Sequence, residues 1–194
     1  MKFLKIFFLL FFCVTINAVT VNTGHANVSL VKYENTQGNQ NRNLIGIRMD
    51  MQKNWHTYWK NPGDSGGPIK VNWSHNDNVS ISEIYWPTPS LIPYEPLMTY
   101  GYKNFVIFPF EIINSNNKNS FIEASIDFLI CDDICVPEKA FIKTNLQDIE
   151  TDNSLYDWFL KVPAQTLPVK ASLVKDFIEI RFSSPFNVTS AIFF

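Results

Sequence analysis

The chain has 194 residues, of which 46% are hydrophobic and 15% aromatic, and its formal net charge at pH 7 is −2. A chain of this length and composition can build one well-buried domain with at most a small appendage, which excludes a disordered protein and a large multidomain enzyme. Its 16 Lys and Arg residues are scattered along the sequence, so no basic segment is available to bind nucleic acid.

The first residues have the layout of an export signal. Two lysines precede an apolar run at residues 6–14, which is about half as long as the roughly 20 residues that a membrane-spanning helix needs. We therefore expect residues 1–26 to be a signal peptide that is cleaved after Ala26, with cleavage after Ala18 as the alternative. Export into an oxidising compartment makes disulfide chemistry the first expectation for any cysteine pair in the mature chain.

Alternation of apolar and polar residues, the pattern of half-buried strands, dominates the rest of the chain. It is clearest over residues 45–51 and 122–130. Weaker strand patterns occur at residues 28–33, 69–73, 79–85, 105–113, 141–146 and 177–182. Many short strands separated by turn-forming clusters predict an all-β fold, specifically an immunoglobulin-like β-sandwich.

One short helix is predicted after the sandwich. Apolar residues recur at helical spacing over residues 155–162, with Asp152, Asn153 or Ser154 as the cap and Pro163 as the stop. The chain beyond this helix has a β pattern again and ends in an apolar run. We therefore expect a partial β extension at the C-terminus.

These patterns divide the chain into three parts. Residues 1–26 are the expected signal peptide, and residues 27–150 form the expected β-sandwich domain. Residues 151–194 comprise a linker helix and the start of a second β region, which we expect to be truncated.

Two cysteines lie outside the predicted signal peptide, Cys131 and Cys135. An extended chain would hold their α-carbons about 13 Å apart, whereas a disulfide needs them within about 7 Å. The segment between them must therefore turn back at the end of the strand over residues 122–130, and Pro137 favours an extended start to the next strand. Alternation places Cys131 on the polar face of its strand, which favours an accessible sulfur.

Three interpretations of this pair remain open. A structural staple is the common case in exported proteins, but closing so short a ring removes only about 2 kcal/mol of unfolded-chain entropy. Short, exposed disulfides are instead the ones that exchange, which favours a redox-active pair. The third interpretation is a soft metal ion such as copper, held by both thiols with His56 or Met98.

Asp132 and Asp133 lie inside the ring that the cysteines close. Nearby negative charge disfavours a thiolate and raises the pKa of a thiol. A dithiol whose thiolate is destabilised is more reducing. We therefore expect this pair to donate reducing equivalents.

The segment at residues 55–66 is unusually rich in aromatic residues and glycines. Its simplest interpretation is an aromatic cluster at the edge of the core that leads into a tight turn, although exposed aromatic faces would also suit a glycan. The run from Gly63 to Pro68 matches the sequence around the nucleophile of chymotrypsin-like proteases. That match fails because His56 lies only nine residues before Ser65, which leaves no room for the first barrel of such a protease.

Several motifs in combination resemble one family: the segment 55–66, Tyr85-Trp86-Pro87, Tyr100-Gly101-Tyr102 and Cys131-Asp132-Asp133-Ile134-Cys135-Val136-Pro137. Over residues 28–146 the chain is similar to the periplasmic N-terminal domain of thiol:disulfide interchange protein DsbD, especially its ScsB-like branch. The resemblance implies a periplasmic immunoglobulin-like sandwich. It also implies a cysteine pair that accepts electrons from a membrane-embedded DsbD-type donor and passes them to periplasmic thioredoxin-fold proteins. We expect no cofactor.

Carried over by position, the two cysteines are the exchanging thiols, and Tyr100 lies in the segment that caps them. The family has an aromatic residue where this chain has Thr99, so Met98 and Tyr102 are further candidates for the cap. The candidate site comprises the reacting Cys131 and Cys135 with the supporting residues Asp132, Asp133, Pro137, Met98, Tyr100, Tyr102 and His56. The rival function is a non-catalytic immunoglobulin-like module that binds a glycan or a soft metal, with an inert disulfide.

Overall fold

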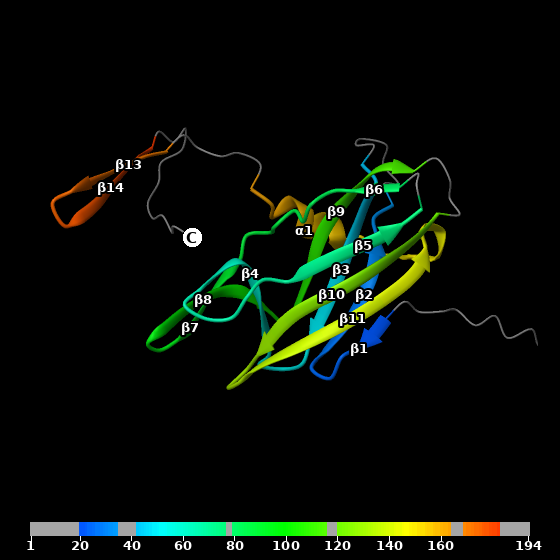
Figure 1. Ribbon diagram of the computed structural model, residues 1–194, viewed down its shortest axis with the longest axis horizontal. Helices are drawn as coiled ribbons and strands as arrows, with labels where there is room; N and C mark the ends of the chain where they lie inside the picture. Colours follow the sequence, from blue (N-terminus) through cyan, green and yellow to red (C-terminus); the bar gives the residue numbers. More distant parts are fainter. Residues whose placement is uncertain (1–19, 35–41, 77–78, 116–119, 164–168, 183–194) are drawn as a thin grey trace, which may run out of the picture.

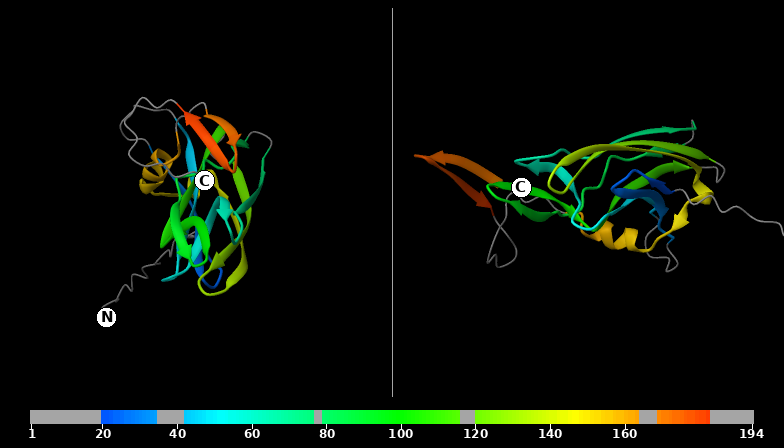
Figure 2. Two further views of the ribbon diagram at one scale, coloured as in Figure 1. Left: turned by 90° about the vertical axis from the view of Figure 1, so that its left-hand side faces the viewer. Right: turned by 90° about the horizontal axis from the view of Figure 1, so that it is seen from below.

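The computed structural model describes residues 20–34, 42–76, 79–115, 120–163 and 169–182. Two β-sheets pack face to face around one apolar core (Figure 1, Figure 2). The predicted immunoglobulin-like β-sandwich is therefore confirmed. Most of the predicted signal peptide lies outside the described residues, as does the end of the chain from residue 183.

The first sheet has the strand order β1-β2-β3-β9-β6, and β12 pairs with β2 in parallel. The bounds of its strands are β1 Thr20–Asn22, β2 Ala26–Lys32, β3 Leu44–Met51, β6 Val79–Ile81, β9 Phe105–Ser115 and β12 Glu150–Thr151.

The second sheet has the order β11-β10-β4-β8-β7, and β5 pairs with the first part of β10. The bounds of its strands are β4 His56–Gly63, β5 Lys70–His75, β7 Ser90–Tyr94, β8 Leu97–Lys103, β10 Phe121–Cys131 and β11 Cys135–Asn145.

The core is built from the alternating apolar residues of facing strands, as the sequence predicts. In β10 every second residue from Ile122 to Ile130 is buried, and in β3 Ile45, Ile47 and Met49 are buried in the same way. This face of β3 pairs with Phe108 and its neighbours in β9. The two sheets therefore close over one another through their apolar faces.

Helix α1 (Ser154–Leu160) follows a short 3-10 turn, η1 (Leu146–Asp148), and packs on the outer face of the first sheet (Figure 2). Its buried Leu155 sits over Gly46 of β3, where a β-carbon would lie 2.8 Å from the leucine side chain. The carboxylate of Asp152 accepts the backbone N–H of Ser154 and so satisfies an N–H group that the helix leaves free. Among the described residues, no helix has the length and apolar character needed to cross a membrane.

The predicted β extension after the helix is a separate hairpin, β13 (Val169–Val174) and β14 (Phe177–Phe182). Its two strands form a two-stranded sheet of their own (Figure 1). The extension is therefore β structure over residues 169–182.

Three strands of the second sheet were not predicted as strands: β4, β7 and β8. Sequence alternation is masked in β4 because Thr57, Tyr58 and Trp59 are buried in succession. Pro93 disguises β7, but this strand lies at the sheet edge, where a missing N–H is tolerated. Conversely, the strand expected over residues 79–85 is shorter and ends at Ile81.

Candidate functional site

The two cysteines face each other at the turn between β10 and β11, at the lower end of the sandwich in Figure 1. They form a disulfide, and their α-carbons are 4.2 Å apart. The Asp132 N–H donates to the carbonyl of Ile134 at 3.2 Å and closes the turn. The prediction that the chain turns back at the end of the strand is confirmed.

The two sulfur-bearing residues differ in exposure. Cys131 is 2% exposed, whereas Cys135 is exposed and follows Ile134, which is 69% exposed. The expectation of an accessible sulfur at Cys131 is wrong because β4 pairs with β10 here, opposite His56, and brings the Tyr58 side chain against the Cys131 sulfur. A reagent that approaches from solvent therefore meets Cys135 first.

Tyr58 of β4 is the side chain in closest polar contact with the disulfide. It is 1% exposed, and its hydroxyl donates to Cys131 Sγ at 2.7 Å and lies 3.2 Å from Cys135 Sγ. Burial raises the pKa of Tyr58, while a hydrogen bond from Ser65 opposes that rise. The phenol is therefore protonated at neutral pH and presents a hydrogen-bond donor to the sulfur of Cys131.

The ring of Tyr58 is fixed by the turn after β4. Gly66 has a φ of +81° and packs directly on the ring, since a β-carbon built on it would lie 2.1 Å from the carbon that bears the hydroxyl. Only glycine combines this backbone conformation with so close an approach. The glycine-rich turn that the sequence predicts thus serves to hold Tyr58.

A hollow of about 290 Å³ opens beside the disulfide. It is lined by Tyr58 and both cysteines, together with residues of β7, β8 and the β10–β11 turn. Ile92 and Leu97 give it an apolar side, while Lys103 and the two aspartates of the turn give it charged edges.

His56 borders the hollow and lies in register with both Cys131 and Lys103. Partial burial lowers the pKa of His56, the positive charge of Lys103 lowers it further, and Asp132 acts in the opposite direction. The imidazole is therefore neutral at pH 7 and does not add a positive charge beside Cys131.

We expect this burial to make folding stability fall as the pH drops below about 6.5, because the unfolded chain then binds a proton at His56 that the folded chain resists. A His56→Gln variant should lose less stability than the parent between about pH 7 and about pH 5. Urea unfolding at both pH values measures this difference. His75→Gln, which removes an exposed ring, is the control and should follow the parent; parallel curves for the parent and His56→Gln would contradict the expectation.

The structure brings five of the predicted site residues together around the hollow: Cys131, Cys135, His56, Asp132 and Asp133. The other four predicted site residues do not line the hollow: Pro137, Met98, Tyr100 and Tyr102.

The three cap candidates lie on the other side of β8, because alternate residues of a strand face opposite sides. Thr99 and Lys103 line the hollow, whereas Tyr102 is buried in the core and donates its hydroxyl to the carbonyl of Pro87. Tyr100 packs against the core, and Met98 contacts Asp64 through its backbone.

Pro137 lies two residues past Cys135 in β11, opposite Leu129 of β10. It borders a separate groove on the sheet. As expected, it belongs to the strand that follows the disulfide turn.

Sequence reasoning missed Tyr58, Ser65, Thr99 and Lys103 as site residues. The signal for Tyr58 was its spacing of two from His56, which places both on one face of a strand. Recognition of β4 as a strand is the missing step, because the sequence alone predicts an aromatic cluster before a turn in this segment. Ser65 and Thr99, whose hydroxyls contact each other beside the hollow, carry no comparable signal in the sequence.

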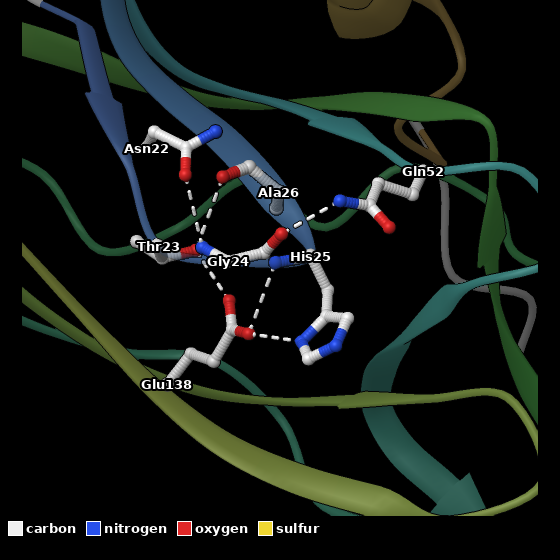
Figure 3. Close-up of polar contacts among 7 residues, drawn as sticks. All are labelled: Asn22, Thr23, Gly24, His25, Ala26, Gln52 and Glu138. Atoms are coloured by element: carbon white, nitrogen blue, oxygen red, sulfur yellow. Dashed lines mark hydrogen bonds and ion pairs between the residues drawn. The ribbon is translucent and has the colours of Figure 1, made fainter.

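A buried carboxylate braces the same end of the sandwich from β11 (Figure 3). Glu138 is 7% exposed and accepts hydrogen bonds from the Thr23 hydroxyl and from the backbone N–H of His25 at 3.1 Å. It also contacts His25 Nδ1 at 2.5 Å, and the His25 ring stacks on Trp55 with centroids 3.8 Å apart. Since Trp55 directly precedes β4, this brace ties the start of β4 to β11.

We expect Glu138→Ala to lower the free energy of unfolding by about 1–3 kcal/mol, because it leaves the donors of Thr23 and His25 without their acceptor. Urea unfolding of the oxidised chain measures the loss. The neighbouring Lys139→Ala is the control: its ion pair with Asp127 is exposed, so it should cost less than about 1 kcal/mol. Equal losses in both variants would argue against the brace.

These features define a small immunoglobulin-like β-sandwich with a partly accessible disulfide at one end. The chain belongs to the family described as thiol:disulfide interchange protein DsbD, N-terminal, whose model matches residues 27–146. The domain is therefore a thiol-disulfide interchange domain, and the resemblance drawn from the sequence is confirmed.

Solved structures agree with the fold. The N-terminal periplasmic domain of ScsB from Proteus mirabilis is similar with a TM-score of 0.65 at 18% sequence identity, over 87% of this chain and 69% of that one. At this identity the likeness concerns the fold. Among the curated proteins no match was found.

Proposed function

We propose that this protein is a periplasmic thiol-disulfide exchange module that relays reducing equivalents from a membrane-embedded DsbD-type donor to periplasmic thioredoxin-fold proteins. Cys131 and Cys135 are the reacting residues. The observation that carries the proposal is the pairing of an exposed sulfur-bearing residue, Cys135, with a buried one whose sulfur accepts a hydrogen bond from Tyr58.

Reduction of the domain begins with attack at Cys135. A donor thiolate forms a bond to Cys135 Sγ, the disulfide breaks, and its electron pair remains on Cys131 Sγ as a thiolate. The Tyr58 hydroxyl already points at that sulfur, so the leaving group is stabilised where its charge develops. A second donor thiol then attacks the mixed disulfide, which releases Cys135 and leaves the donor oxidised.

Delivery of the electrons runs the same chemistry in reverse. The Cys135 thiolate attacks the disulfide of a thioredoxin-fold protein, and a mixed disulfide forms between the two proteins. Cys131 then attacks Cys135 Sγ, which restores the internal disulfide and releases the partner in its dithiol form. Two electrons leave the domain in each cycle.

The rival binding functions find less support in the geometry. A glycan platform would need exposed aromatic faces, but Tyr58 and Trp59 of the aromatic segment are 1% and 8% exposed. For a soft metal, His56 lies beside the cysteines, whereas Met98 does not border the hollow. Thiol-disulfide exchange, by contrast, needs only the exposed Cys135 and the buried Cys131 with its Tyr58 hydrogen bond.

For the signal peptide we propose cleavage after Ala18. The segment at residues 20–22 forms β1, which pairs with β2, and Thr23 and His25 bind Glu138. Cleavage after Ala26 would remove all of these contacts. The mature sandwich then includes β1 and extends to residue 150, and it is followed by the linker helix and the hairpin of β13 and β14.

A redox titration of the exported chain, with dithiothreitol as the reference couple, tests the proposed function. We expect a reduction potential within the range of exchanging disulfides, about −120 to −270 mV, and rapid exchange with a thioredoxin-fold protein. A potential below about −300 mV, with no exchange, would show that the disulfide is an inert staple.

A further inference from the structure

The loop that follows β4 holds a hydroxyl group against Tyr58. It is anchored to the start of β8 by two hydrogen bonds: Asp64 N–H donates to the Met98 carbonyl at 3.0 Å, and Met98 N–H donates to the Asp64 carboxylate at 2.8 Å. This clamp places Ser65 beside the hollow. It also brings Ser65 next to the hydroxyl end of Tyr58, because the adjacent Gly66 packs on the ring carbon that bears the hydroxyl. A hydrogen bond from Ser65 acts to lower the pKa of that phenol.

A third hydroxyl lies behind Ser65. Thr99 of β8 is 2% exposed, and its Oγ1 is 3.0 Å from Ser65 Oγ. Either hydroxyl can be the donor in this contact. A hydroxyl has one proton to donate, so a Ser65 that donates to Tyr58 takes Thr99 as its own donor, and the hydrogen bonds then run from Thr99 through Ser65 and Tyr58 to Cys131 Sγ.

We propose that Ser65 and Thr99 are positioning residues for thiol-disulfide exchange, which act through Tyr58 to stabilise the thiolate of Cys131. Donation to the phenol oxygen polarises its O–H group and strengthens the bond that this group makes to sulfur. The chain of hydroxyls thus lowers the energy of the leaving group when a partner attacks Cys135. The biological role of these residues rests on the proposed function, whereas the experiment below needs no partner protein.

The series of hydroxyl groups orients hydrogen bonds toward Cys131 Sγ and does not transfer a proton to it. The pKa of a free thiol is about 8.5 and that of a free phenol about 10, and burial raises that of Tyr58. A Cys131 thiolate therefore cannot take the proton of Tyr58 permanently. The protons that the reduced cysteines finally carry come from water.

The experiment measures the Cys131 thiol without any partner protein. In a Cys135→Ser background, ultraviolet absorbance of the thiolate against pH gives the acid dissociation constant of Cys131. In the intact chain, the rate of reduction by dithiothreitol reports how well Cys131 leaves. We expect Ser65→Ala to lower both quantities about two- to fourfold, and Thr99→Val to lower them by a smaller factor.

Three comparisons separate the hydroxyl chain from general structural effects. Thr99→Ser keeps the hydroxyl and should restore the parent values. Ser65→Ala should have no effect in a Tyr58→Phe background, because Tyr58 is the only route to the sulfur that the proposal contains. Ser125→Ala, at an exposed position of β10, is the control and should match the parent.

The proposal is overturned if Ser65→Ala and Thr99→Val change only the urea midpoint, or if Ser65→Ala has the same effect with and without the Tyr58 hydroxyl. Failure of the proposed function is a different result. In that case the hydroxyl variants shift the Cys131 thiol as expected, but the parent chain does not exchange with thioredoxin-fold proteins.

Discussion

A Cys131→Ser variant should accumulate a mixed disulfide with an oxidised thioredoxin-fold protein, whereas Cys135→Ser should trap almost none. The reason is the difference in exposure. Cys135 is exposed, but Cys131 is 2% exposed, pairs with β4 at His56, and has its sulfur in contact with the Tyr58 hydroxyl of that strand. A lone Cys135 can attack a partner and then has no neighbour to resolve the bond, while a lone Cys131 is shielded from it.

Non-reducing electrophoresis and mass spectrometry of the trapped species measure this difference, and the double Cys→Ser variant is the blank. Equal trapping by both single variants would contradict the assignment. It would mean that a partner protein reaches the buried Cys131 as readily as it reaches the exposed Cys135. The order of attack in the proposed mechanism would then have to be abandoned, although exchange itself would stand.

Gly66→Ala should produce the largest loss of stability among the substitutions considered. The added β-carbon would meet the Tyr58 ring at 2.1–2.4 Å, and the positive φ of +81° disfavours any side chain. The left-handed backbone costs about 1–2 kcal/mol and overpacking a further 1–3 kcal/mol. We therefore expect the free energy of unfolding to fall by about 2–5 kcal/mol, with faster reaction of Cys131 with alkylating reagents in the reduced chain.

The adjacent Gly67→Ala is a matched control. Its β-carbon would lie 3.5 Å from a Leu129 methyl group, which is an ordinary contact, and its φ is not in the left-handed region. This variant should lose less than about 1 kcal/mol. If urea unfolding gave similar losses for both glycines, the close packing of Gly66 on Tyr58 would not be what holds the ring.

Strand alternation in β3 and β10 and the hairpin at the cysteines could be predicted because each depends on residues close together in sequence. Tyr58 could not be assigned to the site in this way. Its contact with Cys131 joins residues 73 positions apart, and its own strand lacks clean alternation. Tyr100 and Tyr102 were placed near the disulfide by resemblance, but the strand they share turns Thr99 toward it instead.

The exposure of Cys131 illustrates a limit of pattern reasoning. Alternation assigned it correctly to the face opposite Ile130, yet on that face its sulfur is in contact with the buried side chain of Tyr58 from the neighbouring strand β4. Burial on the second side of a sheet depends on elements that come from elsewhere in the chain. Periodicity in one strand carries no information about them.

The short ring of Cys131 and Cys135 has a consequence for folding. Its two cysteines lie within one hairpin, which can form in about 1–10 μs, whereas Tyr58, Ser65 and Thr99 reach it only when β4 and β8 join the sheet. Closing the disulfide therefore requires only this hairpin and not its hydrogen-bonding surroundings. The reactivity of the disulfide is therefore set by the tertiary structure. The difference in reduction potential between the folded and unfolded chain, converted to a free energy by ΔG = −nFΔE, must equal the difference in the free energy of unfolding between the oxidised and reduced domain.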